Sequence, residues 1–78
     1  MLTPNPIMLK AGFRPAAEVA TFIGKAHSTV HRMVTRGDVE GTRDGRALYV
    51  RVASLVAYYE STDNAAMAAA VKEKFACG

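Results

Sequence analysis

Apolar residues recur at helical spacing directly after Pro15. They are Ala16, Val19, Ala20, Phe22 and Ile23. Residues three and four positions apart share one face of a helix, so the pattern predicts a short helix with one buried face. Proline fits the first turn of a helix because its missing N–H would have no partner there, and Gly24 is the kind of residue that ends a helix.

A second helical pattern follows after a turn of three residues and runs from His27 to Arg36. Its apolar positions Val30, Met33 and Val34 predict a buried face, and the polar positions fall on the other faces. Arg36 is followed by a glycine, which again indicates a helix end. Two helices joined by a short turn that contains glycine form a helix-turn-helix.

Alternation of polar and apolar residues replaces the helical period in residues 39–51. The Asp44-Gly45 pair separates two short runs and predicts a β-hairpin with a two-residue type I′ turn. Leu48 and Val50 share one face of the second run, and the residues between them face the other way. We therefore expect the chain to form two helices and then a hairpin.

The two ends of the chain carry different patterns. Prolines at positions 4 and 6 predict an extended opening up to Ile7, and residues 1–12 are expected to form a flexible N-terminal arm. From Ala53 the apolar positions become helical again. Residues 61–64 contain several helix-capping types, so a break between two helices is favoured over one long helix. Residues 61–78 are expected to form a C-terminal alanine-rich helix.

The alanine-rich helix has a narrow apolar stripe of Met67, Val71 and Phe75. The stripe could pack back on the same domain. It could equally join two copies of the chain in a dimer or a cooperative oligomer, because alanine lets two helices approach closely and so small a chain gains from burying apolar surface. The sequence favours neither arrangement.

Length and charge narrow the classes of function. A chain of 78 residues is too short for the large catalytic folds, such as barrels and doubly wound sheets. The net charge is +3, and it is uneven: residues 1–51 hold eight bases and four acids, whereas residues 52–78 hold two bases and three acids. A basic surface on a small domain indicates a polyanionic partner such as double-stranded DNA.

Two further exclusions concern cysteine and membranes. Cys77 is the only cysteine, so the chain cannot form an internal disulfide or a cysteine-based zinc site. No run of eighteen apolar residues occurs, so no membrane partner is expected. We expect a cytoplasmic, nucleoid-associated protein of a bacterial cell.

The polar face of the second predicted helix is the candidate site. In a helix-turn-helix, the N-terminal part of the second helix reaches base edges in the major groove. The candidate base-contacting residues are His27, Ser28, Thr29, His31 and Arg32. Arg43 and Arg46 flank the predicted hairpin turn, where they would reach phosphates or an adjacent minor groove. A solvated helix face without a ligand is the alternative.

Several short motifs together resemble a known family. They are Glu18-Val19-Ala20, Gly24, Ser28-Thr29-Val30, His31-Arg32-Met33-Val34, Arg36-Gly37-Asp38, Gly45-Arg46 and Leu55-Val56-Ala57-Tyr58. In this order and spacing they resemble the small winged helix-turn-helix proteins of the excisionase group, a branch of the MerR-like superfamily found in phages and mobile elements. The resemblance covers residues 13–60.

The resemblance implies a winged helix-turn-helix DNA-binding domain over residues 13–60, mainly α-helical with a small β-hairpin. By position, it assigns backbone or wing contacts to Lys25, Arg36, Arg43 and Arg46. The implied function is sequence-dependent DNA binding with bending, as a recombination directionality factor or a small transcriptional regulator, with an integrase or another phage protein as a partner. Ala26 lies where the family has a serine or threonine cap, so the cap is expected to move to Ser28 or to be lost.

Two other functions stay open at this point. One is a phage packaging component similar to a terminase small subunit, or an assembly component, whose C-terminal helix recruits a protein. The other is a protein-interaction module that does not bind DNA. Catalysis is not expected, since His27 and Ser28 are neighbours on a helix and point about 100° apart. His27 and His31 have the spacing of metal ligands, but no acid or cysteine completes a site, so neither a metal nor another cofactor is expected.

Overall fold

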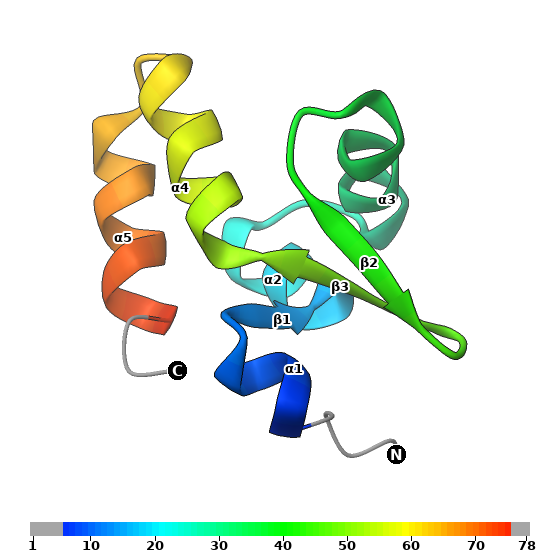
Figure 1. The fold of residues 1–78 in the computed structure, drawn as a ribbon. Helices are drawn as coiled ribbons and strands as arrows, with labels where there is room; N and C mark the ends of the chain where they lie inside the picture. The colour runs from blue at the N-terminus through cyan, green and yellow to red at the C-terminus, as the bar shows by residue number, and fades with distance from the viewer. Residues whose placement is uncertain (1–5, 76–78) are drawn as a thin grey trace.

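A computed structural model describes residues 6–75, which form a mainly helical fold with a small three-stranded antiparallel sheet (Figure 1). The elements are α1 (Pro6–Lys10), β1 (Phe13–Pro15), α2 (Ala16–Ile23), α3 (His27–Arg36), β2 (Gly41–Asp44), β3 (Ala47–Arg51), α4 (Val52–Ser61) and α5 (Ala65–Phe75). The predicted mainly helical class with a small hairpin is confirmed. The predictions for residues 1–5 and for Cys77 lie outside the described residues.

The helix α3 spans His27–Arg36 as predicted, and α2 ends before Gly24 as predicted. α2 starts at Ala16, one residue later than expected, because Pro15 is extended and belongs to β1. Both helices end at a glycine in the left-handed conformation, Gly24 with φ 72° and Gly37 with φ 84°. Residues other than glycine adopt this backbone conformation at a cost in free energy, so the two glycines determine where the helices end.

The N-terminus of α3 settles the question of its cap. The helix begins directly after Ala26, which is extended and supplies no side-chain hydrogen bond. The side-chain cap is therefore lost, and the alternative of a shift to Ser28 is wrong. The first backbone bond of the helix is donated by the N–H of Thr29 to the carbonyl oxygen of Ala26, at 3.0 Å.

A third strand, β1, joins the predicted hairpin. β3 lies in the centre of the sheet, with β1 on one side and β2 on the other, and both pairs are antiparallel. Phe13 lies opposite Arg51, and Pro15 lies opposite Tyr49. This strand was not predicted, because three residues are too few to show an alternation. Proline is tolerated in it because β1 is an edge strand.

The hairpin turn lies one residue later than predicted. Asp44 pairs with Ala47 across the hairpin, so the two turn residues are Gly45 and Arg46, and the predicted Asp44-Gly45 turn is wrong. Gly45 has φ 65°, whereas the φ of Arg46 is not positive. A type I′ turn needs positive φ at both central residues, whereas glycine at the first central position alone is the pattern of type II′.

The hairpin lies close against α3 and continues directly into α4. At Gly41 an added Cβ would lie 2.9 Å from both methyl groups of Val34 on α3, so only glycine allows this approach. At the other end, β3 finishes at Arg51 and α4 begins at Val52, with no residue between them. The N–H of Val52 also donates a 2.9 Å hydrogen bond to the carbonyl oxygen of Gly12, which anchors this junction to the turn after α1.

The C-terminal helices α4 and α5 lie side by side and are separated by the predicted break (Figure 1). Asp63 has φ 60°, a left-handed conformation that interrupts a right-handed α-helix. Asn64 then caps α5, because its side-chain oxygen accepts a 3.2 Å hydrogen bond from the N–H of Met67. The prediction of two helices is therefore confirmed.

The apolar stripe of α5 packs on the chain's own core. Val71 is fully buried, Phe75 is 4% exposed and Met67 is half-buried against the same cluster. The ring of Phe75 meets that of Phe22 edge to face, with 5.6 Å between the ring centroids. Of the two arrangements that the sequence left open, the structure shows packing on the same chain. An interface between copies through Met67, Val71 and Phe75 stays a prediction, and Val71 and Phe75 have little exposed surface to offer it.

The N-terminal segment differs from the predicted arm. α1 begins at Pro6, so the expected extended conformation is wrong for Pro6 and Ile7. Proline is favoured at the first position of a helix, which explains the early start. None of the helices between residues 6 and 75 is long and apolar enough to cross a membrane.

Candidate nucleic-acid interface

The polar face of α3 is open to solvent because the helix buries only its opposite side. Val30 and Met33 reach into the core, and the face away from them surrounds a shallow hollow. This hollow is lined by His27, Ser28, His31, Arg32 and Thr35. α3 lies on the side of the molecule away from α4 and α5, so the C-terminal helices do not cover this face (Figure 1).

A hydrogen bond links this face to the hairpin. Nη2 of Arg43 on β2 lies 2.8 Å from Nε2 of His31 on α3. Arginine can only donate, so the guanidinium of Arg43 donates this bond and Nε2 of His31 accepts it. Together with the close packing at Gly41, this bond holds the hairpin beside α3.

A second hollow lies between α3 and the hairpin tip. Arg43 and Arg46 line it, and His27 and His31 line both this hollow and the first one. Pro15 and the first residues of α2 form its far wall. The two hollows therefore form one continuous surface, called here the α3–hairpin surface, which runs from Arg32 and Thr35 to Arg46.

Six of the nine predicted site residues line the α3–hairpin surface: His27, Ser28, His31, Arg32, Arg43 and Arg46. The other three do not line either hollow. Thr29 is half-buried, and Lys25 is exposed in the turn before α3. Arg36 is exposed at the end of α3 and lies 3.6 Å from the carboxylate of Asp38, which offsets part of its charge.

The N-terminus of α3 adds two backbone donors to the surface. Thr29 makes the first intrahelical hydrogen bond, so the N–H groups of His27 and Ser28 have no acceptor within the helix. With Ala26 in the cap position, no side chain accepts from them. Such N–H groups, at the positive end of the helix dipole, favour anions such as phosphate.

Comparisons with protein-family models, with curated proteins and with solved structures found no match to this chain. The assignment of a function therefore depends on the geometry and charge of the α3–hairpin surface.

The two histidines of this surface are poorly placed to bind a metal ion together. The rings of His27 and His31 are 6.2 Å apart between centroids, and Nε2 of His31 is engaged by Arg43. Within residues 6–75 the structure brings together no group of three or more histidine, cysteine, aspartate or glutamate side chains that could hold a metal ion.

Sequence reasoning missed two residue roles in this surface. The contact between His31 and Arg43 joins residues twelve positions apart, and no local pattern predicts such a pair. Gly41 did have a signal, because glycine is unfavourable inside a strand and often indicates a close approach of two backbones. Its neighbour proves to be the side chain of Val34 and the carbonyl oxygen of Tyr49.

Proposed function

We propose that this protein binds double-stranded DNA as a winged helix-turn-helix, with α3 in the major groove and the β2–β3 hairpin as the wing. The observation that carries the proposal is the 2.8 Å hydrogen bond between Arg43 and His31. It joins the polar face of α3 and the arginines of the hairpin in one surface. A duplex could therefore contact both at once without a rearrangement of the protein.

The dimensions and side chains of α3 suit base contacts. An α-helix with its side chains is about 10–12 Å across, and the major groove of B-DNA is about 12 Å wide. Arg32 can donate two hydrogen bonds to a guanine, and Ser28 and the two histidines can bond several base edges. The N–H groups at the start of α3 would fix a phosphate beside the groove.

The hairpin supplies the contacts that do not depend on base sequence. Arg43 and Arg46 are both exposed at its tip, and Lys25 is exposed at the other end of the surface. These cations would neutralise phosphates on either side of the groove. Arg36 contributes less, because Asp38 is its partner.

The proposed role is that of an architectural or regulatory protein of a phage or mobile element, as the resemblance to the excisionase group implies. One α3 helix contacts few base pairs. Useful specificity requires about 4–10 kcal/mol over non-specific DNA, so several copies would bind neighbouring sites. The packaging or assembly alternative relies on the apolar stripe of α5 to recruit a protein. Val71 and Phe75 of this stripe are buried in the chain's own core, so this alternative has less support.

Fluorescence anisotropy with a labelled duplex of random sequence tests the proposal. We expect binding at 50 mM salt and a loss of roughly 100-fold in affinity at 200 mM, since about four phosphate contacts give a log–log slope of about −3.6. Arg46→Gln should weaken binding to all sequences alike. Lys74→Gln, on the exposed side of α5, removes the same charge away from the surface and should have little effect.

Two results would contradict the proposal. One is a complete lack of binding at 50 mM salt. The other is an equal loss of affinity in Arg46→Gln and Lys74→Gln, which would show that only net charge matters. Arg32→Ala separates the helix from the wing, because it should lower the preference among selected sequences while leaving random-sequence binding nearly intact.

A further inference from the structure

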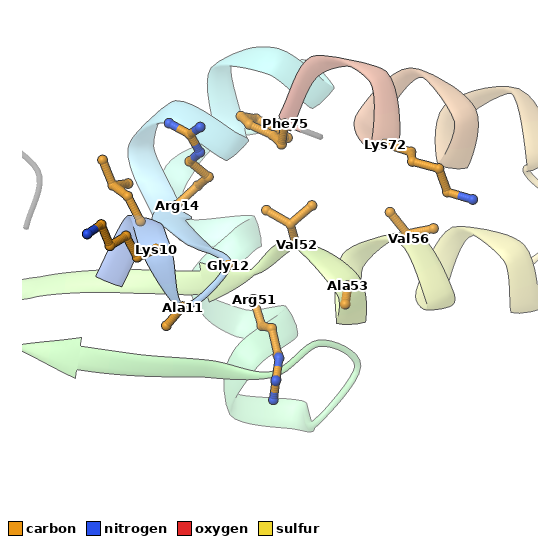
Figure 2. A pocket seen from close by; sticks show the side chains of 11 residues that line it. Lys10, Ala11, Gly12, Arg14, Arg51, Val52, Ala53, Val56, Lys72 and Phe75 are labelled. Atoms are coloured by element: carbon orange, nitrogen blue, oxygen red, sulfur yellow. The ribbon is translucent and has the colours of Figure 1, made fainter. Parts of the chain in front are cut away.

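A separate pocket lies at the opposite end of the sheet from the hairpin tip. Its walls are the turn between α1 and β1, the first turns of α4 and the last turns of α5 (Figure 2). The pocket has a volume of about 460 Å³. Sites for small organic ligands usually measure about 300–1,000 Å³. None of its lining residues belongs to α3 or β2, so it is distinct from the α3–hairpin surface.

The inner walls of this pocket are apolar. Val52 and Val56 on α4 point toward Phe75 on α5 (Figure 2). Leu9 of α1 also lines the pocket. Phe75 and Val56 belong to the buried core, so the pocket opens onto the edge of the core. An apolar group placed there would be removed from water, which stabilises it by about 25 cal/mol per Å² buried.

The charged residues around these walls are all basic. They are Lys10, Arg14, Arg51 and Lys72, and no acidic side chain of the described chain lines the pocket. Arg14 and Arg51 already have carboxylate neighbours outside it, Glu18 at 3.8 Å and Glu40 at 3.1 Å. Lys10 and Lys72 come from α1 and α5, at two ends of the opening, and both side chains point outward at its rim (Figure 2).

We propose that this pocket binds a small amphipathic organic anion, with its apolar body against Val52, Val56 and Phe75 and its carboxylate or phosphate at the end of the opening where Lys72 lies. A neutral apolar ligand would make no use of the basic rim. An inorganic anion would make no use of the apolar walls. A ligand that carries both parts satisfies both features of the pocket. The proposal does not depend on DNA binding, because the two surfaces share no residue.

The dye 8-anilinonaphthalene-1-sulfonate is a suitable probe, since it combines an apolar body with one negative charge and fluoresces when its body leaves water. Titration of the full chain should show saturable binding of one dye. Decanoate should displace the dye, whereas decanol and inorganic phosphate should each require at least tenfold higher concentration. Lys72→Gln should weaken dye binding by about threefold, as expected for one exposed ion pair, and Lys74→Gln should leave it unchanged.

A matched pair on α4 tests the position of the site. Ala53 and Ala57 are both exposed, but only Ala53 lines this pocket. Ala53→Trp should fill the pocket and reduce dye affinity at least tenfold, whereas Ala57→Trp should not. Thermal unfolding shows whether both variants keep the fold.

Several outcomes would overturn the assignment. Equal effects of Ala53→Trp and Ala57→Trp, or of Lys72→Gln and Lys74→Gln, would place the dye elsewhere on the protein. Displacement by decanol or by phosphate as readily as by decanoate would show that the pocket recognises only one half of the proposed ligand. Displacement by an acidic hexapeptide with a central phenylalanine, but not by decanoate, would assign the pocket to a partner protein.

Discussion

Gly41 decides how closely the hairpin can approach α3. A Cβ at this position would lie 2.9 Å from the methyl groups of Val34 and 3.0 Å from the carbonyl oxygen of Tyr49. A backbone oxygen cannot rotate away as a side chain can. Gly41 therefore allows the hairpin to pack closely against α3, although it has no side chain of its own.

Gly41→Ala should lower the free energy of unfolding by about 1–3 kcal/mol, because the added methyl group forces the strand away from its neighbours. Urea denaturation followed by circular dichroism measures the change. Thr42→Ala is a matched control at the next, exposed position. The double change Gly41→Ala and Val34→Ala should recover part of the loss. An unchanged midpoint in Gly41→Ala would contradict the packing argument.

Tyr59 should lower the free energy of unfolding at alkaline pH. Burial raises the pKa of its phenol above the ordinary value, and the neighbouring Tyr58 raises it further. Below that ordinary value, near pH 10, both the folded and the unfolded chain hold the proton. Above it, the unfolded chain releases the proton more readily than the folded chain does, so stability falls as pH rises.

Tyr59→Phe should therefore reduce the loss of stability between pH 8 and pH 11. Urea denaturation at the two pH values gives the free energy of unfolding for each protein. The wild-type chain should show the steeper fall, because only it retains the phenol of Tyr59. An equal fall in both proteins would show that other groups cause the alkaline sensitivity.

At the scale of single elements, α3 begins without a side-chain cap. Ala26 leaves the first N–H groups of α3 without a side-chain acceptor. A helix that reads DNA can use these donors for a phosphate, and a capped helix cannot use them as freely. Stability and DNA affinity should therefore respond in opposite directions when a cap is added.

Ala26→Ser and Ala26→Asp should each stabilise the fold by about 1 kcal/mol, because each side chain accepts a bond from the first turn of α3. Aspartate should also weaken DNA binding more than serine does, since its negative charge occupies the position of a phosphate. Thermal unfolding and anisotropy measure the two effects. If aspartate leaves DNA affinity unchanged, the start of α3 does not lie against the DNA backbone.

The elements also show which local patterns can be read from the sequence. Periodic apolar residues and a following glycine fixed the ends of α2 and α3, because both signals act within one turn of helix. The strand β1 was not predicted, because only its pairing with β3 makes residues 13–15 a strand. The turn at Gly45 and Arg46 was misplaced by one residue, since the glycine fitted two registers and the packing of Leu48 and Val50 selects between them.

At the scale of the whole molecule, α5 belongs to the same core as α2 and α4. Ala68, Val71 and Phe75 are buried in one cluster with residues of both helices. The sequence predicts the apolar stripe of α5. It does not predict which residues pack against the stripe, because the spacing of apolar residues carries no information about their contacts. For the candidate site, likewise, the residues of α3 could be named in advance, whereas the bond from Arg43 to His31 depends on how the hairpin folds back.

Phe75→Ala should lower the free energy of unfolding by about 3–5 kcal/mol, because it removes a buried ring that packs on Phe22. For a small domain, this is enough to unfold much of the protein at 37 °C. Urea denaturation of Phe75→Ala beside Lys74→Ala, a neighbouring exposed position, measures the difference. If Phe75→Ala changed only the oligomeric state and left stability intact, the stripe would be an interface between copies.

The direct passage from β3 into α4 has a consequence for any assembly of this protein. Because no residue lies between Arg51 and Val52, and Val52 is bonded to Gly12, we expect the hairpin and α4 to tilt together. A protein that grips α4 or α5 would thereby set the tilt of the hairpin tip. If the protein binds DNA as proposed, neighbouring molecules on one duplex could then change each other's DNA contacts through α4 and α5, without touching α3.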